Sequence, residues 1–510
     1  MSATKVAVAT TSQGAADAAA EICELGGNAV DCAIAAAMYS INTEPGVCAL
    51  AGSAYITIWP ANGDPITIDG NVAVPGIGLP ADFSPVAESV YMEYGGGIET
   101  RVGVASVAVP GTPAALHLAS EKYGGIEWRD LLGPAIIAAR DGFPLSAACN
   151  YYLGYSGESI FGRSDEGHGA LHDDAGALLD VGANVVVPHL ADSLAALAEE
   201  GSQFFYDGEL AEAIADHVQD RGGFLTREDL RRYEPLVREP LLVNVGDWMI
   251  ATNPPPAVGG AVLGAMLLAF NEHPASQWDA DTLRYLLRVQ ESVLSFRKQN
   301  LDLSEDVPRD AAEMLELAQS GELLSRWSSG STVHTSAVDD KGLACAITAS
   351  SGYGSGEMPA GTGLWLNNCL GELELNRRGY DAGPPGIRLP SNMAPSAGRT
   401  DHQVLAMGSP GADRITTALH QFLVNYVQLG HNLADAVAHP RLHLEIDGSS
   451  RNIAVEPGLD LPDTGISVTN YPDISMYFGG VVAAVHDSKD GFSVAADPRR
   501  AGGTFIVEEG

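Results

Sequence analysis

The sequence predicts a mixed α-helix and β-strand (α+β) protein that folds as one large unit. Short runs of β-branched and apolar residues alternate along the chain with longer alanine- and leucine-rich stretches of helical spacing. Hydrophobic residues make up 45% of the 510 residues, which is enough for a large buried core. No internal repeat stands out and no low-complexity segment is long enough to act as a linker, so we expect one αβ unit without separate domains.

The N-terminal part of the chain alternates strands with helices whose ends carry clear signals. A helix predicted from Gln13 to Leu25 ends at Gly26-Gly27-Asn28, a typical helix C-cap. Residues 71–106 give no clear assignment, and residues 150–190 have the composition of loops and short turns. Further helices are predicted at Ala29–Met38, Ala114–Lys122 and Trp128–Asp141, and strands at 6–9, 49–59, 65–70 and 107–113.

The middle of the chain is predicted to be mainly helical. A strand pair, Leu241–Val245 and Trp248–Thr252, turns around Gly246-Asp247. Helices are predicted at Ser193–Gly201, Glu209–Arg221, Arg227–Tyr233, Val262–Phe270 and Leu283–Asn300.

A hairpin after the polar run 325–331 begins at an unusual place. From Thr332 the pattern becomes that of a strand, and Thr332, His334 and Ser336 fall on one face of it. A turn at 339–342 leads into a second strand at 343–348. This pattern is compatible with an ordinary hairpin after a loop. It is also compatible with a chain that is cut before Thr332, which would free a threonine whose own α-amine can serve as its base.

A glycine turn lies further along the chain. A strand at 404–407 runs into Gly408-Ser409-Pro410-Gly411, and a helix predicted to end at about Leu429 follows. A glycine turn at a helix N-terminus presents backbone N–H groups, so it can hold an anion or an oxyanion.

Charge excludes some classes of partner. The formal net charge is -37, from 65 acidic and 28 basic residues, so we expect no nucleic-acid partner, because little is available to neutralise phosphates. We attribute the acidity to solubility or to adaptation to a salty habitat. No stretch approaches the ~20 apolar residues of a membrane span, and residues 1–10 contain too short an apolar run for a signal peptide. We therefore expect no membrane association and a cytoplasmic protein.

The cysteine pattern is also typical of a cytoplasmic protein. They form no CxxC pair and no metal-binding spacing, and we expect them to be buried free thiols in a reducing cytoplasm. They are Cys23, Cys32, Cys48, Cys149, Cys345 and Cys369.

A series of short motifs, in this order and spacing, carries a family resemblance that runs nearly end to end. The motifs are Glu24-Leu25-Gly26-Gly27-Asn28-Ala29-Val30-Asp31, Val109-Pro110-Gly111-Thr112, Ala138-Ala139-Arg140-Asp141-Gly142-Phe143, Asn253-Pro254-Pro255-Pro256 with Gly259-Gly260, Thr332-Val333-His334, Asn367-Asn368, Gly408-Ser409-Pro410-Gly411 and Ala496-Asp497-Pro498-Arg499. Together they resemble the γ-glutamyltranspeptidase family of N-terminal-nucleophile hydrolases.

The resemblance implies a fold and a reaction. The fold would be a four-layer αββα sandwich, and the precursor would cut itself between Ser331 and Thr332. A large subunit, 1–331, and a small subunit, 332–510, would stay in one intertwined domain and could pair as a homodimer. Thr332 would attack the carbonyl of a small-molecule amide through its Oγ, and water or an amine would release the acyl group. No metal or cofactor is implied.

The resemblance also implies roles for individual residues. Gly411 and Ala412 match the oxyanion-hole pair, and Ser350 matches a hydroxyl residue that contacts the nucleophile. Glu372 stands where the family has an acidic residue for the substrate α-amine. His334 matches a family histidine, although a core histidine that shapes the strand is an alternative interpretation. The residues expected to bind substrate are His334, Asn368, Glu372, Ser391 and Asn392.

This sequence departs from the family pattern around the substrate carboxylate. The arginine that binds it in transpeptidases would fall near Pro80, but no arginine lies between Asp69 and Arg101. The family's serine pair becomes Ser391-Asn392, the asparagine expected after Ser350 is missing, and the lid loop is short. A carboxylate without its arginine loses a strong bidentate contact.

A true γ-glutamyl donor is therefore not the expected substrate. The alternatives are an amidohydrolase of small acids such as oxamate and an acylase of larger side chains. An alternative of another class is a non-catalytic binding protein on the same scaffold, and the presence of Thr332, Ser350 and the glycine turn argues against it.

Overall fold

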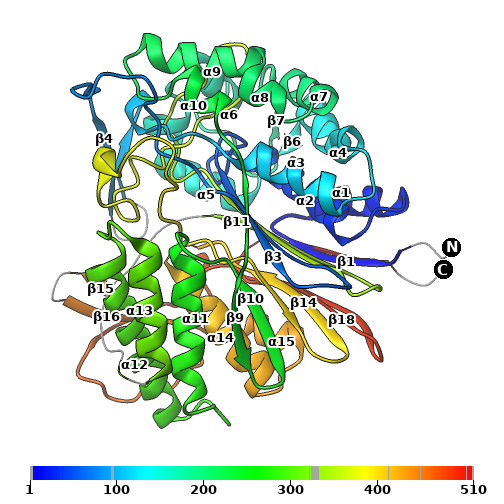
Figure 1. The fold of residues 1–510 in the computed structure, drawn as a ribbon, viewed down its shortest axis with the longest axis vertical. Helices are drawn as coiled ribbons and strands as arrows, with labels where there is room; N and C mark the ends of the chain where they lie inside the picture. Colours follow the sequence, from blue (N-terminus) through cyan, green and yellow to red (C-terminus); the bar gives the residue numbers. More distant parts are fainter. Residues whose placement is uncertain are drawn as a thin grey trace.

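The computed structural model describes residues 4–93, 97–320, 322, 332–411, 413–447, 450–500 and 502–507. Two β-sheets lie face to face at the centre, and helices cover the outer face of each sheet (Figure 1). The predicted α+β class and the four-layer αββα sandwich are therefore confirmed.

The first sheet has seven strands, and each is antiparallel to its neighbours. The strand that follows Thr332 lies inside this sheet and is buried along its whole length. In spatial order the strands are β20 (Gly503–Ile506), β1 (Val6–Thr10), β11 (Val333–Asp339), β12 (Ala344–Ser350), β2 (Ser53–Trp59), β3 (Ile66–Gly70) and β8 (Leu236–Arg238).

The second sheet has six strands and packs its inner face against the first. The layer between the sheets is rich in alanine, including Ala7, Ala346 and Ala406, so the two backbones approach closely. In spatial order the strands are β19 (Gly491–Ala496), β18 (Val482–Asp487), β14 (Gln403–Gly408), β13 (Ser396–Arg399), β10 (Trp248–Thr252) and β9 (Leu241–Val245).

The outer helical layer of the seven-stranded sheet begins with two well-capped helices. The hydroxyl of Ser12 accepts a hydrogen bond from the backbone N–H of Ala15, and Asn28 forms a reciprocal capping box with Asp31. This layer and the helices outside it (Figure 1) are α1 (Gln13–Glu24), α2 (Ala29–Thr43), α3 (Thr112–Tyr123), α4 (Trp128–Asp141), α5 (Ala147–Ser156), α6 (Asp165–Leu171), α7 (Leu190–Glu200), α8 (Gln203–Asp207), α9 (Glu209–Asp220) and α10 (Arg227–Arg231).

The opposite layer covers the six-stranded sheet with α11 (Val258–Asn271), α12 (Ala280–Phe296), α13 (Val307–Gln319), α14 (Arg414–Leu423) and α15 (Leu433–Ala438). A short π-helix, η4 (Arg297–Leu301), continues α12, and another, η6 (Val424–Gln428), continues α14. The remaining strands form small peripheral sheets: β4 (Glu88–Met92) with β5 (Ile98–Val102), β6 (Phe143–Pro144) with β7 (Asn184–Val185), and β15 (Leu442–Asp447) with β16 (Ser450–Val455) and β17 (Ser467–Asn470).

Several local predictions need correction. Residues 150–190, expected as loops, contain the end of α5, the π-helix η3 (Gly157–Phe161) and α6, because buried side chains such as Phe161 anchor this glycine-rich stretch. The predicted strand end at 107–113 is reduced to an isolated bridge at Val109 before α3. Helix α2 extends five residues beyond Met38, to Thr43.

The six cysteines are buried free thiols, as predicted. Among the described parts of the chain, we find no helix with the length and apolar character needed to span a membrane.

Candidate active site

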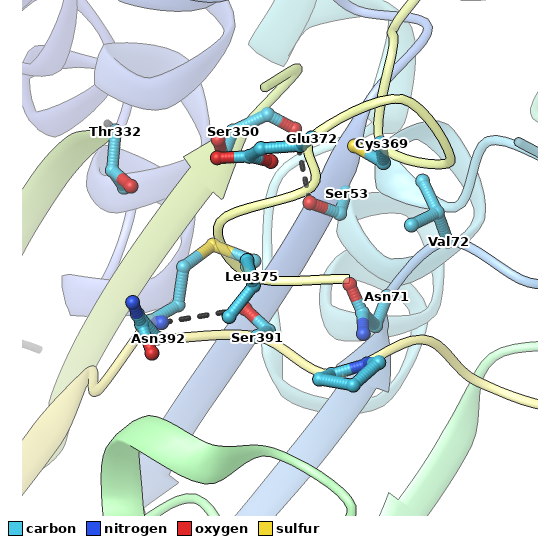
Figure 2. Close-up of a pocket in the computed structure, with 12 residues that line it drawn as sticks. Ser53, Asn71, Val72, Thr332, Ser350, Cys369, Glu372, Leu375, Ser391 and Asn392 are labelled. Carbon is cyan, nitrogen blue, oxygen red and sulfur yellow. Dashed lines mark hydrogen bonds between the residues drawn. The ribbon is translucent and has the colours of Figure 1, made fainter. Parts of the chain in front are cut away.

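Three hydroxyl residues lie side by side at one end of neighbouring strands. In the β11–β12 pair Val333 lies opposite Ala349, so the same register places Thr332 opposite Ser350. In the β12–β2 pair Ser350 lies opposite Ser53. Since adjacent strands are roughly 4.8 Å apart, the sheet itself brings the three side chains together, and Figure 2 shows all three at the same cavity.

The cavity at these strand ends is small and is lined by both polar and apolar side chains. Its volume of about 20 Å³ has room for about one water molecule. Thr332 lies at one end of it in Figure 2, and Val72 and Cys369 lie at the other. The lining residues are Ser53, Asn71, Val72, Thr332, Ser350, Cys369, Glu372, Leu375, Pro390, Ser391, Asn392 and Met393.

Backbone contacts hold Ser350 in place beside Thr332. Ser53 Oγ donates a hydrogen bond to the carbonyl oxygen of Ser350 (2.9 Å), and Ser350 Oγ accepts one from the backbone N–H of Gly352 (3.2 Å). Gly352 has a φ of +65°, a conformation that favours glycine. Thr332 is only 3% exposed, so its hydroxyl lies in an environment where electrostatic interactions are strong.

Glu372 places an acidic side chain in the cavity wall. It is 4% exposed, and burial raises its pKa to about 8, with further increases from the nearby acidic side chains of Glu374 and Asp413. Of the described residues that line the cavity, none is lysine or arginine. The cavity therefore favours a cationic or neutral ligand group over a carboxylate.

The Ser391–Asn392 wall is connected to a buried ion network. Asn392 Nδ2 donates to Asp413 Oδ1 (2.9 Å), and Arg297 Nη1 donates to the same oxygen (2.8 Å). Arg297 is 1% exposed, and its Nε donates to Asp302 Oδ1 (2.9 Å). Burial alone would raise the pKa of Asp413, but the charges of Arg297 and Lys298 outweigh it and the pKa is lowered.

The glycine turn adjoins this network. Gly411 has a φ of +122°, Asp413 follows two residues later, and α14 begins at Arg414. The Asn392–Asp413 hydrogen bond therefore joins the turn to the cavity wall. Ala412 and Ser331, predicted as oxyanion-hole residue and cleavage-site residue, lie outside the described residues, so their roles stay predictions.

Two predicted substrate-binding residues do not line the cavity. His334 is 1% exposed, its ring nitrogens lie within hydrogen-bond distance of Thr348 Oγ1 (2.6 Å) and Ser336 Oγ (2.9 Å), and burial lowers its pKa to about 3. It packs against Gly408 of the second sheet. These contacts match the alternative interpretation of His334 as a core histidine.

Asn368 is the second predicted substrate-binding residue that does not line the cavity. Its Oδ1 accepts from the backbone N–H of Tyr353 (2.7 Å), and its Nδ2 donates to Thr100 Oγ1 (2.9 Å) and to the carbonyl of Arg101 (3.0 Å). It joins three segments around the cavity. The guanidinium of Arg101 stacks on the ring of Tyr380, 4.6 Å from its centre, and does not line the cavity.

Sequence reasoning missed two polar residues of the cavity, Ser53 and Asn71. Ser53 reaches it through the pairing of β2 with β12, across nearly 300 residues of sequence. Asn71 follows β3, and its Nδ2 donates to the carbonyl of Leu389 (2.6 Å). A prediction of strand pairing would have identified Ser53, whereas no local pattern marks Asn71.

The αββα fold, with a threonine directly before an inner strand and a second hydroxyl opposite it, defines the structural class of the N-terminal-nucleophile hydrolases. The family described as Gamma-glutamyltranspeptidase matches residues 15–507. The chain therefore belongs to the γ-glutamyltranspeptidase family, and the resemblance found in the sequence is confirmed.

The chain is distantly similar to two bacterial glutathione hydrolase proenzymes. The glutathione hydrolase proenzyme of Escherichia coli (strain K12) is 28% identical over 474 residues, which cover 86% of this chain and 80% of that protein. The glutathione hydrolase proenzyme of Pseudomonas aeruginosa is 29% identical over 478 residues, covering 86% and 83%. The crystal structure of cephalosporin acylase from Bacillus halodurans has the same fold, with a TM-score of 0.78, 23% identity, and coverage of 100% of this chain and 97% of that one.

Proposed function

We propose that this protein is an autoprocessing threonine amidohydrolase that cleaves its own chain between Ser331 and Thr332. The observation that carries the proposal is the position of Thr332, directly before an inner strand, opposite Ser350 and at a cavity closed by Glu372, Ser391 and Asn392. Cleavage would leave a large subunit, 1–331, and a small subunit, 332–510. The buried free thiols support a reducing compartment such as the cytoplasm.

The reaction proceeds through an acyl-enzyme. The α-amine of Thr332, with a pKa of about 7.7–8.0, takes the proton of Thr332 Oγ as the oxygen attacks the amide carbonyl. Backbone N–H groups of the Gly411 turn stabilise the oxyanion. The proton passes to the leaving amine as the C–N bond breaks, and an ester to Thr332 remains. Water or a second amine then attacks the ester and restores the hydroxyl.

The proposed donor is an amide whose acyl group is held without an arginine–carboxylate clamp. The absence of lysine and arginine from the described cavity wall and the buried Glu372 support an acyl group that carries an amine or no charge. This favours a side-chain acylase over a γ-glutamyl transferase, and a small-acid (oxamate-like) amidohydrolase is the second alternative. A rate of γ-glutamyl transfer to glycylglycine as high as the rate of hydrolysis of the other amides would contradict this substrate assignment.

Electrophoresis of the purified protein tests the central claim. We expect wild type to separate into two fragments under denaturing conditions, with Thr332 at the new N-terminus of the smaller one by N-terminal sequencing. Thr332→Ala should stay whole, and Thr332→Ser, which keeps a hydroxyl, should be cleaved more slowly. A panel of amides then identifies the acyl group: γ-glutamyl, oxamoyl and glutaryl amides, which carry a carboxylate, beside amides of an uncharged and of an amine-bearing acyl group. A wild type that stays whole and hydrolyses none of them would favour the non-catalytic binding protein.

A further inference from the structure

The turn that carries Gly411 rests on a second stretch of backbone, residues 475–481. A side chain at Gly411 would collide with the Cα of Gly479. In return, a Cβ on Gly479, whose φ is +89°, would lie 2.8 Å from Ser409 Oγ and 3.0 Å from the carbonyl oxygen of Pro410. The two segments therefore meet through glycine backbone with no side chain between them.

One side chain fastens this contact. Ser409 is 1% exposed, and its Oγ accepts a hydrogen bond from the backbone N–H of Gly480 (3.0 Å) while donating one to the carbonyl of Pro410 (2.6 Å). The hydroxyl thus bonds to both segments within two residues of Gly411. A small movement of residues 475–481 would be passed directly to the turn.

Charged side chains hold the segment on both sides of Gly479. Arg441 Nη1 donates to the carbonyl of Phe478 (3.1 Å), and Asp497 Oδ2 accepts from the backbone N–H of Val481 (2.7 Å). The same Asp497 oxygen pairs with Arg441 Nη2 (2.7 Å). Phe478 and Val481, which lie on either side of Gly479, are therefore connected through the Arg441–Asp497 ion pair.

Two further residues complete a buried ion cluster of Arg441, Glu456, Asp497 and Arg499. Arg499 pairs with Glu456 and, through Nη1, with Asp497 Oδ1 (3.1 Å), and Glu456 Oε1 accepts from the backbone N–H of Ser475 (2.9 Å). All four are at most 7% exposed, and their formal charges cancel. Burying four charges costs free energy, so the cluster is weak evidence of added stability. Its hydrogen bonds to residues 475–481 indicate instead that it fixes the position of that segment.

We propose that residues 475–481, clamped by this ion cluster, are the positioning element of the oxyanion turn, and that Ser409, Gly479 and Asp497 are positioning residues for the amide-cleaving step. This inference rests on the proposed function. Oxyanion donors act over about 2.7–3.1 Å, so a shift of a few tenths of an ångström in the turn weakens transition-state binding more than substrate binding. The signature is a loss of kcat with little change in KM.

The decisive comparison is between two glycines of left-handed conformation. Gly479→Ala introduces a methyl group against Ser409 and Pro410, and we expect kcat on an amide that wild type hydrolyses to fall at least about tenfold, with KM within about twofold. Gly465→Ala is the matched control: its φ is +68°, and nothing lies within 4 Å of its Cβ position. It carries the same kind of backbone strain, and its kcat should equal that of wild type.

A second pair of variants separates positioning from folding. Asp497→Asn keeps an oxygen for the Val481 N–H and should retain more of the wild-type kcat than Asp497→Ala. Ser409→Ala removes one hydroxyl and decides the question if Gly479→Ala does not fold. A folded Gly479→Ala or Ser409→Ala with wild-type kcat, beside an active wild type, would overturn this inference alone. A wild type inactive on every amide would overturn the proposed function and this inference together.

Discussion

Glu372 shows how the surroundings of one residue restrict what a site can bind. Its carboxyl is buried beside two other acidic side chains, so it holds its proton up to a pKa of about 8. Near neutral pH the wall of the cavity is therefore close to uncharged. A substrate ammonium group would favour loss of this proton, and the ion pair would form only in the complex.

This protonation makes stability depend on pH. In the folded protein Glu372 keeps its proton up to about pH 8, whereas in the unfolded chain it loses the proton near its ordinary value of 4.5. The unfolded state is therefore favoured increasingly as pH rises between these values. We expect Glu372→Gln, which never ionises, to gain about 2–5 kcal/mol in free energy of unfolding relative to wild type between pH 5 and pH 8.5. Urea denaturation at both pH values measures this.

The matched control is Glu239→Gln, at an exposed carboxyl. Its difference from wild type should change little over the same pH range. An equal pH dependence in both variants would show that Glu372 is not held in its protonated form.

At the scale of elements, Arg297 connects the π-helical end of α12 to the turn that carries Gly411. This fully buried guanidinium donates to Asp302, which directly follows η4, and to Asp413 at the start of α14. Asn392 of the cavity wall shares the Asp413 oxygen. Helix packing and the shape of the cavity are therefore connected through one cation.

We expect Arg297→Leu to lower the free energy of unfolding by about 3–5 kcal/mol, because two buried carboxylates lose the guanidinium that they share, and Asn392 and Arg377 compensate only in part. The control is Arg284→Leu on the same helix, since Arg284 pairs with Asp281 at the surface and such pairs contribute about 0–1 kcal/mol. Urea denaturation of both variants measures the difference. Similar values for the two would mean that the Arg297 network contributes no more than a surface pair.

Elements with complete local signals could be predicted from the sequence, and those made by packing could not. Helix Trp128–Asp141 and the strands Leu241–Val245 and Trp248–Thr252 have the bounds expected from periodicity and turn residues. The helices between Ala147 and Leu171 were missed, because their glycines favour loops and distant packing supplies their order. Helix α13 was also missed, although Asp306 caps it and Pro308 stands in its first turn.

The predicted site residues also divide into those that line the cavity and those that do not, and only the long-range packing decides which is which. Thr332, Ser350, Glu372, Ser391 and Asn392 line one cavity, and their catalytic and binding roles stay predictions. His334 and Asn368 carry motif positions but serve the sheet and the loops around the cavity. A motif marks which residues matter, whereas only the register and the side-chain contacts show which of them face the ligand.

At the scale of the whole molecule, each sheet mixes strands from both sides of the Ser331–Thr332 bond. In the seven-stranded sheet β11 and β12 lie between β1 and β2, and in the six-stranded sheet β13 pairs with β10. We therefore expect the fragments of the cleaved protein to elute together in size-exclusion chromatography without denaturant and to separate only in it. Fragments that separate under native conditions would contradict this arrangement.

The interleaving of strands also has a kinetic consequence. An uncut chain that unfolds can refold by itself, because β11 and β1 belong to one polymer and its refolding is first order. After cleavage the same two strands belong to different molecules, and recovery requires them to meet. Refolding of the cleaved protein should therefore become second order and slow down on dilution, whereas Thr332→Ala should refold at a rate independent of concentration. Cleavage would then make folding of this protein largely a single event in its lifetime.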